Sequence, residues 1–215
     1  MGQDPWRRLV SSREVVLASV RSAIQGTAVP QLSRSYDTHL DLDRSAVLDL
    51  FVERVGDYRA DVWRVDRADL AHTIGSVLAG YGAGSVVVPA DLDARWLTTV
   101  TCPVLRDDPP LTPRQLDEID AVITSSAVSI ALTGTVILDA GPGQGRRVLS
   151  LIPDLHICVV DAATVVGAVP EAIPRLDPTR PMTWVSGPSA TSDIELDRVE
   201  GVHGPRKLVV CLVTD

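Results

Sequence analysis

The segment at residues 186–195 contains the side chains best suited to acid–base chemistry. Asp193 and Glu195 supply carboxylates, and His203 follows in a Gly-Pro turn at 201–205. Because a carboxylate and an imidazole can exchange a proton near neutral pH, these three side chains are candidate catalytic groups. A Ser/Thr turn with Asp193 as a helix cap is the structural alternative, and a His in such a turn is often only hydrogen-bonded. The same segment offers donors and close backbone approach for a polar ligand at Ser186, Gly187, Ser189 and Thr191.

A glycine-rich segment at residues 139–147 follows an apolar run. Glycines let backbone N–H groups approach an anion, and an adjacent guanidinium adds charge. The spacing fits neither the GxGxxG dinucleotide motif nor the GxxxxGK[ST] phosphate loop. A flexible turn with solvated arginines explains the composition equally well. The candidate ligand-binding residues are Gly141, Gly143, Gly145 and Arg146.

A third polar segment consists of Thr133, Gly134 and Thr135, directly before a predicted strand at 135–138. Two hydroxyls and a glycine at this place could line the floor of a ligand pocket. They could also cap the strand in a tight turn, and the spacing does not decide between the two.

Composition and charge exclude several functions. The chain has 215 residues with 20 Lys and Arg against 28 Asp and Glu, so its formal charge of -8 repels nucleic acid. The three cysteines, Cys102, Cys158 and Cys211, lie more than fifty residues apart, so they form no iron–sulfur or zinc motif. We therefore expect no intrinsic cofactor, no bound metal and a reducing, cytoplasmic location. No export signal or membrane-spanning run is expected.

Helical and strand periods alternate along the chain and predict the elements that position these segments. Residues 1–29 are expected to form an amphipathic helix at 6–24, with Asp4 as its N-cap, and a connector. The main domain is expected to span residues 30–215. The N-terminal helix could also support a homo-oligomer. In the main domain, helices beginning at Asp43 and Asp66 alternate with β-branched runs. This alternation of helices and strands predicts an α/β fold with a mostly parallel sheet flanked by helices. Polar loops that follow such strands meet at the carboxyl edge, where ligands bind. The strand containing His156 is apolar, so this histidine is expected to be buried.

Five segments in this order resemble the lactate utilization protein C family, the LUD domain. They are ALTGTVIL (131–138), GPGQGR (141–146), LSLIPDLHI (149–157), SGPSATSDIE (186–195) and GVHGP (201–205). The resemblance is strong over residues 120–213 and looser over 30–120. It implies a fold similar to the sugar-phosphate isomerase and CoA-transferase group, known as NagB/RpiA.

The resemblance also implies a role in oxidising L-lactate to pyruvate beside iron–sulfur partner proteins. This chain would be the component without redox centres, binding a small anionic metabolite or a partner. Two positions depart from the family pattern: Leu132 stands where the family often has an acidic residue, and Ala190 where many members have Arg. In the related CoA-transferases a carboxylate acts as the nucleophile toward an acyl group, and Leu132 has no carboxylate to do so. The competing hypothesis is a stand-alone enzyme for a phosphorylated or CoA-linked small molecule, with Asp193 or Glu195 as base and His203 as acid.

Overall fold

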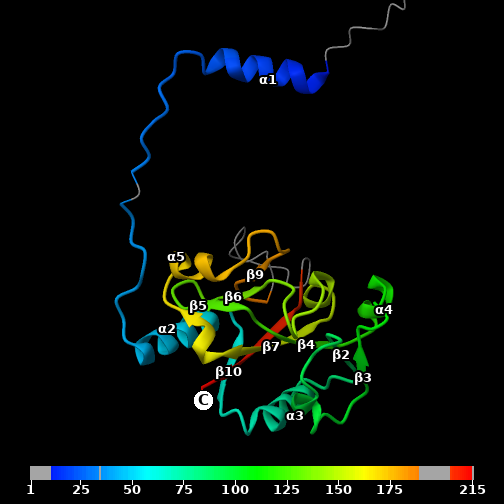
Figure 1. The fold of residues 1–215 in the computed structure, drawn as a ribbon. Helices are drawn as coiled ribbons and strands as arrows, with labels where there is room; N and C mark the ends of the chain where they lie inside the picture. The colour runs from blue at the N-terminus through cyan, green and yellow to red at the C-terminus, as the bar shows by residue number, and fades with distance from the viewer. Residues whose placement is uncertain (1–10, 34, 189–203, 215) are drawn as a thin grey trace, which may run out of the picture. The chain divides into compact units, whose positions relative to one another are not determined.

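The computed structural model describes residues 11–33, 35–188 and 204–214 (Figure 1). Its contacts divide the chain into two units, Met1–Tyr36 and Asp37–Asp215. The helix of the first unit, α1, spans Ser12–Ala23 and begins later than the predicted start at residue 6. A capping box explains this start, because Ser11 accepts a bond from the Glu14 N–H and Glu14 accepts one from the Ser11 N–H. No residue of α1 is buried within the unit.

A six-stranded parallel sheet is the centre of the second unit. Its order is β1-β10-β7-β4-β2-β3, and each neighbouring pair is parallel. The predicted α/β class with a mostly parallel sheet is therefore confirmed. The strands are β1 (Asp61–Val65), β2 (Val86–Val88), β3 (Val104–Arg106), β4 (Ala121–Ser125), β7 (Leu155–Asp161) and β10 (Lys207–Val213).

Helices and a second sheet cover the two faces of this parallel sheet. On one face α3 (Leu70–Gly80) packs its apolar residues against alternate residues of β4, β7 and β10. On the other face α2 (Arg44–Asp57) places Phe51 in a second cluster with the remaining residues of β7 and β10. Asp43 caps α2 as predicted, and α4 (Pro113–Asp117) begins with the expected cap at Thr112. The four central strands are thus buried on both faces, which explains their continuous apolar runs.

The second, smaller sheet has the order β8-β5-β6-β9 and mixed direction. One face, with Val136 and Leu138, packs toward β7 and β10, and the other, with Val128 and Ile137, packs toward a short helix, α5. Figure 1 shows β5 and β6 between α5 and the larger sheet. The sequence did not predict β5 or β8. The bounds are β5 (Val128–Ile130), β6 (Thr135–Leu138), β8 (Val165–Val166), β9 (Thr183–Val185) and α5 (Val169–Ala172).

Among the described residues of the second unit there are also four short 3-10 segments. In the parts of the chain that the structure describes, no helix is long and apolar enough to cross a membrane. The segments are η1 (Ala94–Leu97), η2 (Arg147–Ser150), η3 (Ala162–Thr164) and η4 (Ile173–Arg175).

Candidate functional site

A chain of three hydroxyls joins two of the polar segments that the sequence singled out. Thr133 Oγ1 and Thr135 Oγ1 share a hydrogen bond of 2.7 Å, and Thr135 Oγ1 and Ser186 Oγ share one of 2.8 Å. The antiparallel pairing of β6 with β9 explains this meeting, because Val136 lies opposite Val185. The three hydroxyl protons can serve the two bonds between the hydroxyls and the Thr133 carbonyl, which lies 3.4 Å from Thr135 Oγ1. When Thr135 donates to a neighbouring hydroxyl instead, the hydroxyl at one end of the series can donate to a ligand.

Two glycines allow the backbone of this site to pass close to the end of α2. Gly134 has φ +57°, and a Cβ there would lie 2.7 Å from the backbone carbonyl of Arg54. Gly187 has φ +84°, and its Cβ would lie 2.8 Å from the Cβ of Tyr58. Neither place has room for a side chain, so these candidate residues shape the site through their backbone. A hollow of about 330 Å³ adjoins them, lined by Arg54, Asp57, Tyr58, Leu132 and Thr133.

Substituting Gly134 tests this close approach. We expect Gly134→Ala to lower the free energy of unfolding by about 2 kcal/mol, because the methyl group meets helix backbone and φ is unfavourable for alanine. Gly82→Ala is the matched control, since Gly82 has φ +68° with open space around it, and it should cost only about 1 kcal/mol. Urea unfolding of both variants measures the difference. Equal losses would contradict the steric role of Gly134.

Two of the three candidate glycines in the glycine-rich segment donate their backbone N–H groups to side chains of the protein. The Gly141 N–H donates to Asp139 Oδ1 and the Gly143 N–H donates to Asp91 Oδ2, each at 3.0 Å. Carboxylates of the chain thus take the place that a bound anion would occupy. Gly145 has φ +68°, and its Cβ would lie 2.6 Å from the side chain of Leu149, so this glycine allows close packing. Binding of a ligand by these glycines stays a prediction.

Arg146 has a carboxylate partner as well. Its Nε and Nη2 donate to the two oxygens of Asp107 at 2.6 and 2.7 Å, and Nη2 also donates to the Leu111 carbonyl. Burial alone would raise the pKa of Asp107, but the Arg146 guanidinium and the Leu111 N–H hold it below its usual value. A bidentate pair fixes the guanidinium in place. The geometry gives Arg146 a role in joining two loops, and anion binding by it stays a prediction.

Five of the candidate residues lie outside the described part of the chain, and their roles stay predictions. On either side of that gap, Pro188 and Gly204 lie together, since a Cβ on Gly204 would be 3.3 Å from the Pro188 carbonyl oxygen. They line a hollow of about 120 Å³ with Ser186, Gly187 and Pro205. The five residues are Ser189, Thr191, Asp193, Glu195 and His203.

The carboxyl edge of the parallel sheet has a hollow that the sequence analysis missed. Its volume is about 160 Å³, and its polar groups come from Ser125 and Ser126 at the end of β4, Asp161 at the end of β7, and Arg67 after β1. The rule that ligands bind at the carboxyl ends of parallel strands could have found it. Applying that rule requires knowing that β4 and β7 are neighbours, which the sequence does not state.

His156 lies inside the sheet and is fully buried, as predicted. Its Nε2 and Thr124 Oγ1 share a hydrogen bond of 2.8 Å, and Thr124 Oγ1 lies 3.7 Å from the sulfur of Cys158. Burial lowers the pKa of His156 to about 4, so the ring is neutral at physiological pH. Burial likewise raises the pKa of Cys158 to about 12, which keeps a thiol there. These groups are structural.

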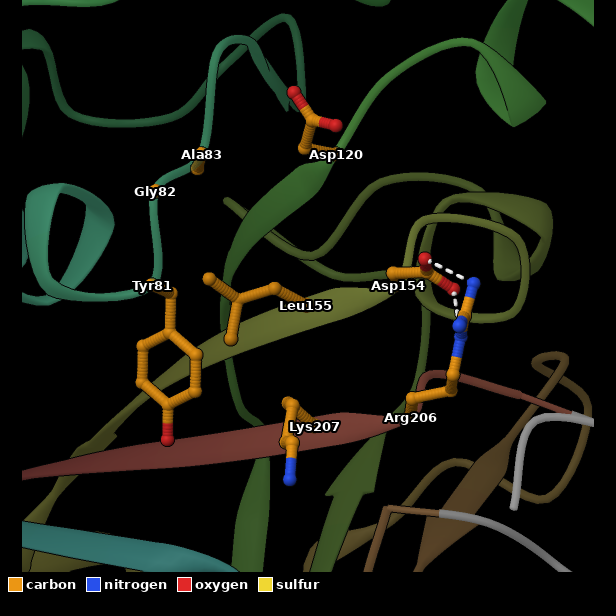
Figure 2. Close-up of a pocket in the computed structure, with 8 residues that line it drawn as sticks. All are labelled: Tyr81, Gly82, Ala83, Asp120, Asp154, Leu155, Arg206 and Lys207. Carbon is orange, nitrogen blue, oxygen red and sulfur yellow. Dashed lines mark hydrogen bonds and ion pairs between the residues drawn. The ribbon is translucent and has the colours of Figure 1, made fainter. Parts of the chain in front are cut away.

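Figure 2 shows a hollow of about 300 Å³ at the opposite edge, where the parallel strands begin. Asp154 and Arg206 form two hydrogen bonds of 2.9 and 2.6 Å there. Asp120 accepts a bond from the Gly84 N–H, and the Tyr81 hydroxyl donates to Asp61. Asp154 and Arg206 therefore neutralise each other, and Asp120 and the Tyr81 hydroxyl have hydrogen-bond partners within the protein. Among the residues that can be described, no group of three or more His, Cys, Asp or Glu could hold a metal ion.

The fold and these sites define an α/β protein with an open parallel sheet, a second small sheet and polar hollows beside both. The LUD domain family matches residues 48–213, and the chain belongs to this family. It is 47% identical to the lactate utilization protein C of Deinococcus radiodurans, covering 92% of this chain and 93% of that protein. The lactate utilization protein C of Geobacillus kaustophilus is 28% identical, with 89% of each chain covered.

A solved structure agrees with the fold. The crystal structure of a DUF162 family protein from Deinococcus radiodurans has a TM-score of 0.70 and 44% identity, and it covers 80% of this chain and 99% of that one. This agreement supports the family and the α/β architecture. The narrower similarity to the NagB/RpiA group stays a prediction.

Proposed function

We propose that this protein takes part in the utilization of L-lactate, as a component without a redox centre that works beside iron–sulfur proteins in the cytoplasm. The observation that supports this most is the 47% identity with a lactate utilization protein C over nearly the whole length of both chains. Because the match covers 93% of that relative, nearly all of it has a counterpart in this chain. The partners are inferred from the family resemblance.

The cysteines of the chain support a division of labour with its partners. An iron–sulfur cluster usually needs four thiolates, and this sequence has three cysteines. Cys158 and Cys211 are buried, and burial raises the pKa of each to about 12. Electron transfer through such clusters would therefore take place on the partner proteins. The hydroxyl chain of Thr133, Thr135 and Ser186 is the proposed contact for a small anion or for a partner.

Deleting the gene in its native host tests the pathway. We expect the deletion strain to lose growth on L-lactate as sole carbon source and to keep growth on pyruvate, since pyruvate is the product of the proposed step. A plasmid copy should restore growth, and Thr98→Val is a matched control because the Thr98 hydroxyl is exposed and bonded only to its own turn. Thr135→Val, which breaks the hydroxyl chain, should restore growth poorly. Normal growth of the deletion strain on L-lactate would refute the proposal.

Purification of the tagged protein from lactate-grown cells tests the partners. Iron and acid-labile sulfide should co-elute with it, although the chain itself has no cluster motif.

The stand-alone enzyme that the sequence also allowed, acting through Asp193, Glu195 and His203, has no observation in its favour, since these residues lie outside the described part. Turnover of an acyl-CoA or sugar phosphate by the isolated chain would support that alternative instead.

A further inference from the structure

Strand β1 forms an open edge of the parallel sheet. Within the part of the chain that the structure describes, β1 pairs with β10 on one side and with no strand on the other. The other edge strands, β3, β8 and β9, have three, two and three residues, and edge strands this short offer little pairing to another chain. β1 has five residues and contains neither proline nor lysine, which often protect such an edge. It therefore has room to pair with a further strand.

The charged side chains of β1 are held by neighbouring helices, and its central side chain is exposed. Arg64 pairs with Asp49 of α2, and Asp61 accepts a hydrogen bond from the hydroxyl of Tyr81, the C-cap residue of α3. These partners reduce the charge that an approaching strand would meet. Trp63, at the centre of the strand, is 50% exposed. Because tryptophan is enriched among the residues that dominate binding at protein interfaces, its exposure here favours a protein partner.

The bonds between β1 and β10 determine which backbone groups face the open side. The Thr214 N–H donates to the Val65 carbonyl at 3.2 Å, so the backbone polar groups of Val65 face β10. The direction of these groups alternates along a strand, so those of Trp63 face β10 as well. Those of Val62 and Arg64 face outward. Two N–H and two C=O groups of β1 are thus directed at the open side.

We propose that two copies of this chain form a dimer in which β1 pairs antiparallel with β1 of the other copy, about a twofold axis at Trp63. In this register, Val62 lies opposite Arg64 of the partner subunit, and each such pair exchanges both backbone hydrogen bonds. Trp63 lies opposite Trp63 of the partner subunit at a position without hydrogen bonds, where facing Cα atoms are only about 4.5 Å apart. The two six-stranded sheets then form one continuous sheet.

The occupant of this edge is a second copy because β1 is complementary to itself. A twofold axis through Trp63 pairs all five residues of β1, and every outward-facing backbone group then has a partner. No like charges lie directly opposite one another, since Arg64 faces a valine and Asp61 faces Val65 of the partner subunit. Aromatic pairs across antiparallel strands are stabilising. Each copy has a formal charge of -8, and physiological salt screens the resulting long-range repulsion.

Sedimentation equilibrium of the full chain at physiological salt tests the dimer. We expect the original protein to be dimeric at about 100 μM, and Trp63→Lys to raise the dissociation constant by about thirtyfold or more, because two facing charges replace the aromatic pair. Trp184→Lys is the matched control: Trp184 is 41% exposed at the centre of edge strand β9 in the other sheet, and its loss should leave the dimer intact. Melting temperatures show that each variant is folded. A monomeric original protein, or unchanged dimerisation of Trp63→Lys, would refute the proposal.

Disulfide crosslinking tests the register independently. Trp63→Cys places two thiols opposite each other across the twofold axis, at a Cα separation that a disulfide spans, so oxidation with diamide should give a covalent dimer. Arg64→Cys is the control, because its two copies lie diagonally at about 7–8 Å and should crosslink poorly. The original chain, with Cys158 and Cys211 buried and Cys102 partly buried, should stay uncrosslinked. A dimer without crosslinking of Trp63→Cys, or equal crosslinking of Arg64→Cys, would overturn the β1 pairing and place the contact on another surface such as α1.

Discussion

Replacing Phe51 with alanine is expected to lower the free energy of unfolding by about 3–5 kcal/mol. Phe51 is completely buried and lies among the largest side chains of the core. It anchors α2 against β7 and β10, in the cluster that also contains Val136 and Leu138 of β6. Losing the ring leaves a cavity in the cluster that also contains Val55, whose backbone lies beside Gly134. The variant should therefore weaken the hydroxyl site as well as the fold.

Chemical denaturation at pH 7.5 measures the Phe51→Ala effect, with Val16→Ala as the control. Val16 is 58% exposed on α1, so its truncation should change stability by less than about 0.5 kcal/mol. The midpoint should fall for Phe51→Ala with little change in the slope. A loss below about 1 kcal/mol would contradict the packing of α2 on the sheet.

Acidification is expected to remove about 3 kcal/mol of stability through His156 alone. Burial lowers its pKa from 6.5 to about 4 in the folded protein. The unfolded chain then binds a proton at a higher pH than the folded chain does. The contribution of His156 is fully present above pH 6.5, decreases as the pH falls below that value, and is lost by about pH 4. The magnitude follows from about 1.4 kcal/mol for each pKa unit.

Unfolding measured at several values between pH 7.5 and 4.5 checks this prediction. His156→Leu removes the titrating group and should flatten the pH dependence in that window, although it also leaves the Thr124 hydroxyl without its ring partner. His72→Gln is the control for the loss of a histidine as such, because His72 is exposed on α3. An equally steep curve for His156→Leu would show that other groups cause the acid instability.

Two of the polar segments could be recognised from the sequence because their composition is unusual. Threonines beside Gly134 and a serine before Gly187 marked places where backbone passes closely and hydroxyls gather. The bond between Thr135 and Ser186 could not be predicted, since it depends on the register of β6 against β9. The anion-binding loop was expected at Arg146 because the sequence does not show that Arg146 has a partner. Asp107 lies 39 residues away in the sequence, so its pairing with Arg146 was invisible before the chain folded.

By itself the sequence determined the α/β class, the main helices and the buried strands of the parallel sheet. Hydrophobic period, caps such as Asp43 and Thr112, and continuous apolar runs are local properties, so they act before any long-range contact forms. The five ordered segments also determined the family.

Only the tertiary structure decided which polar side chains have a partner and which face a hollow. Strand order placed the ends of β4, β7 and β10 together, and it separated β5, β6, β8 and β9 into a second sheet. Strand neighbours are chosen by the burial of whole faces, which is a property of the complete chain. For this reason Ser126 and Asp161 became part of one pocket, while Arg146, the more conspicuous residue in the sequence, became part of an ion pair.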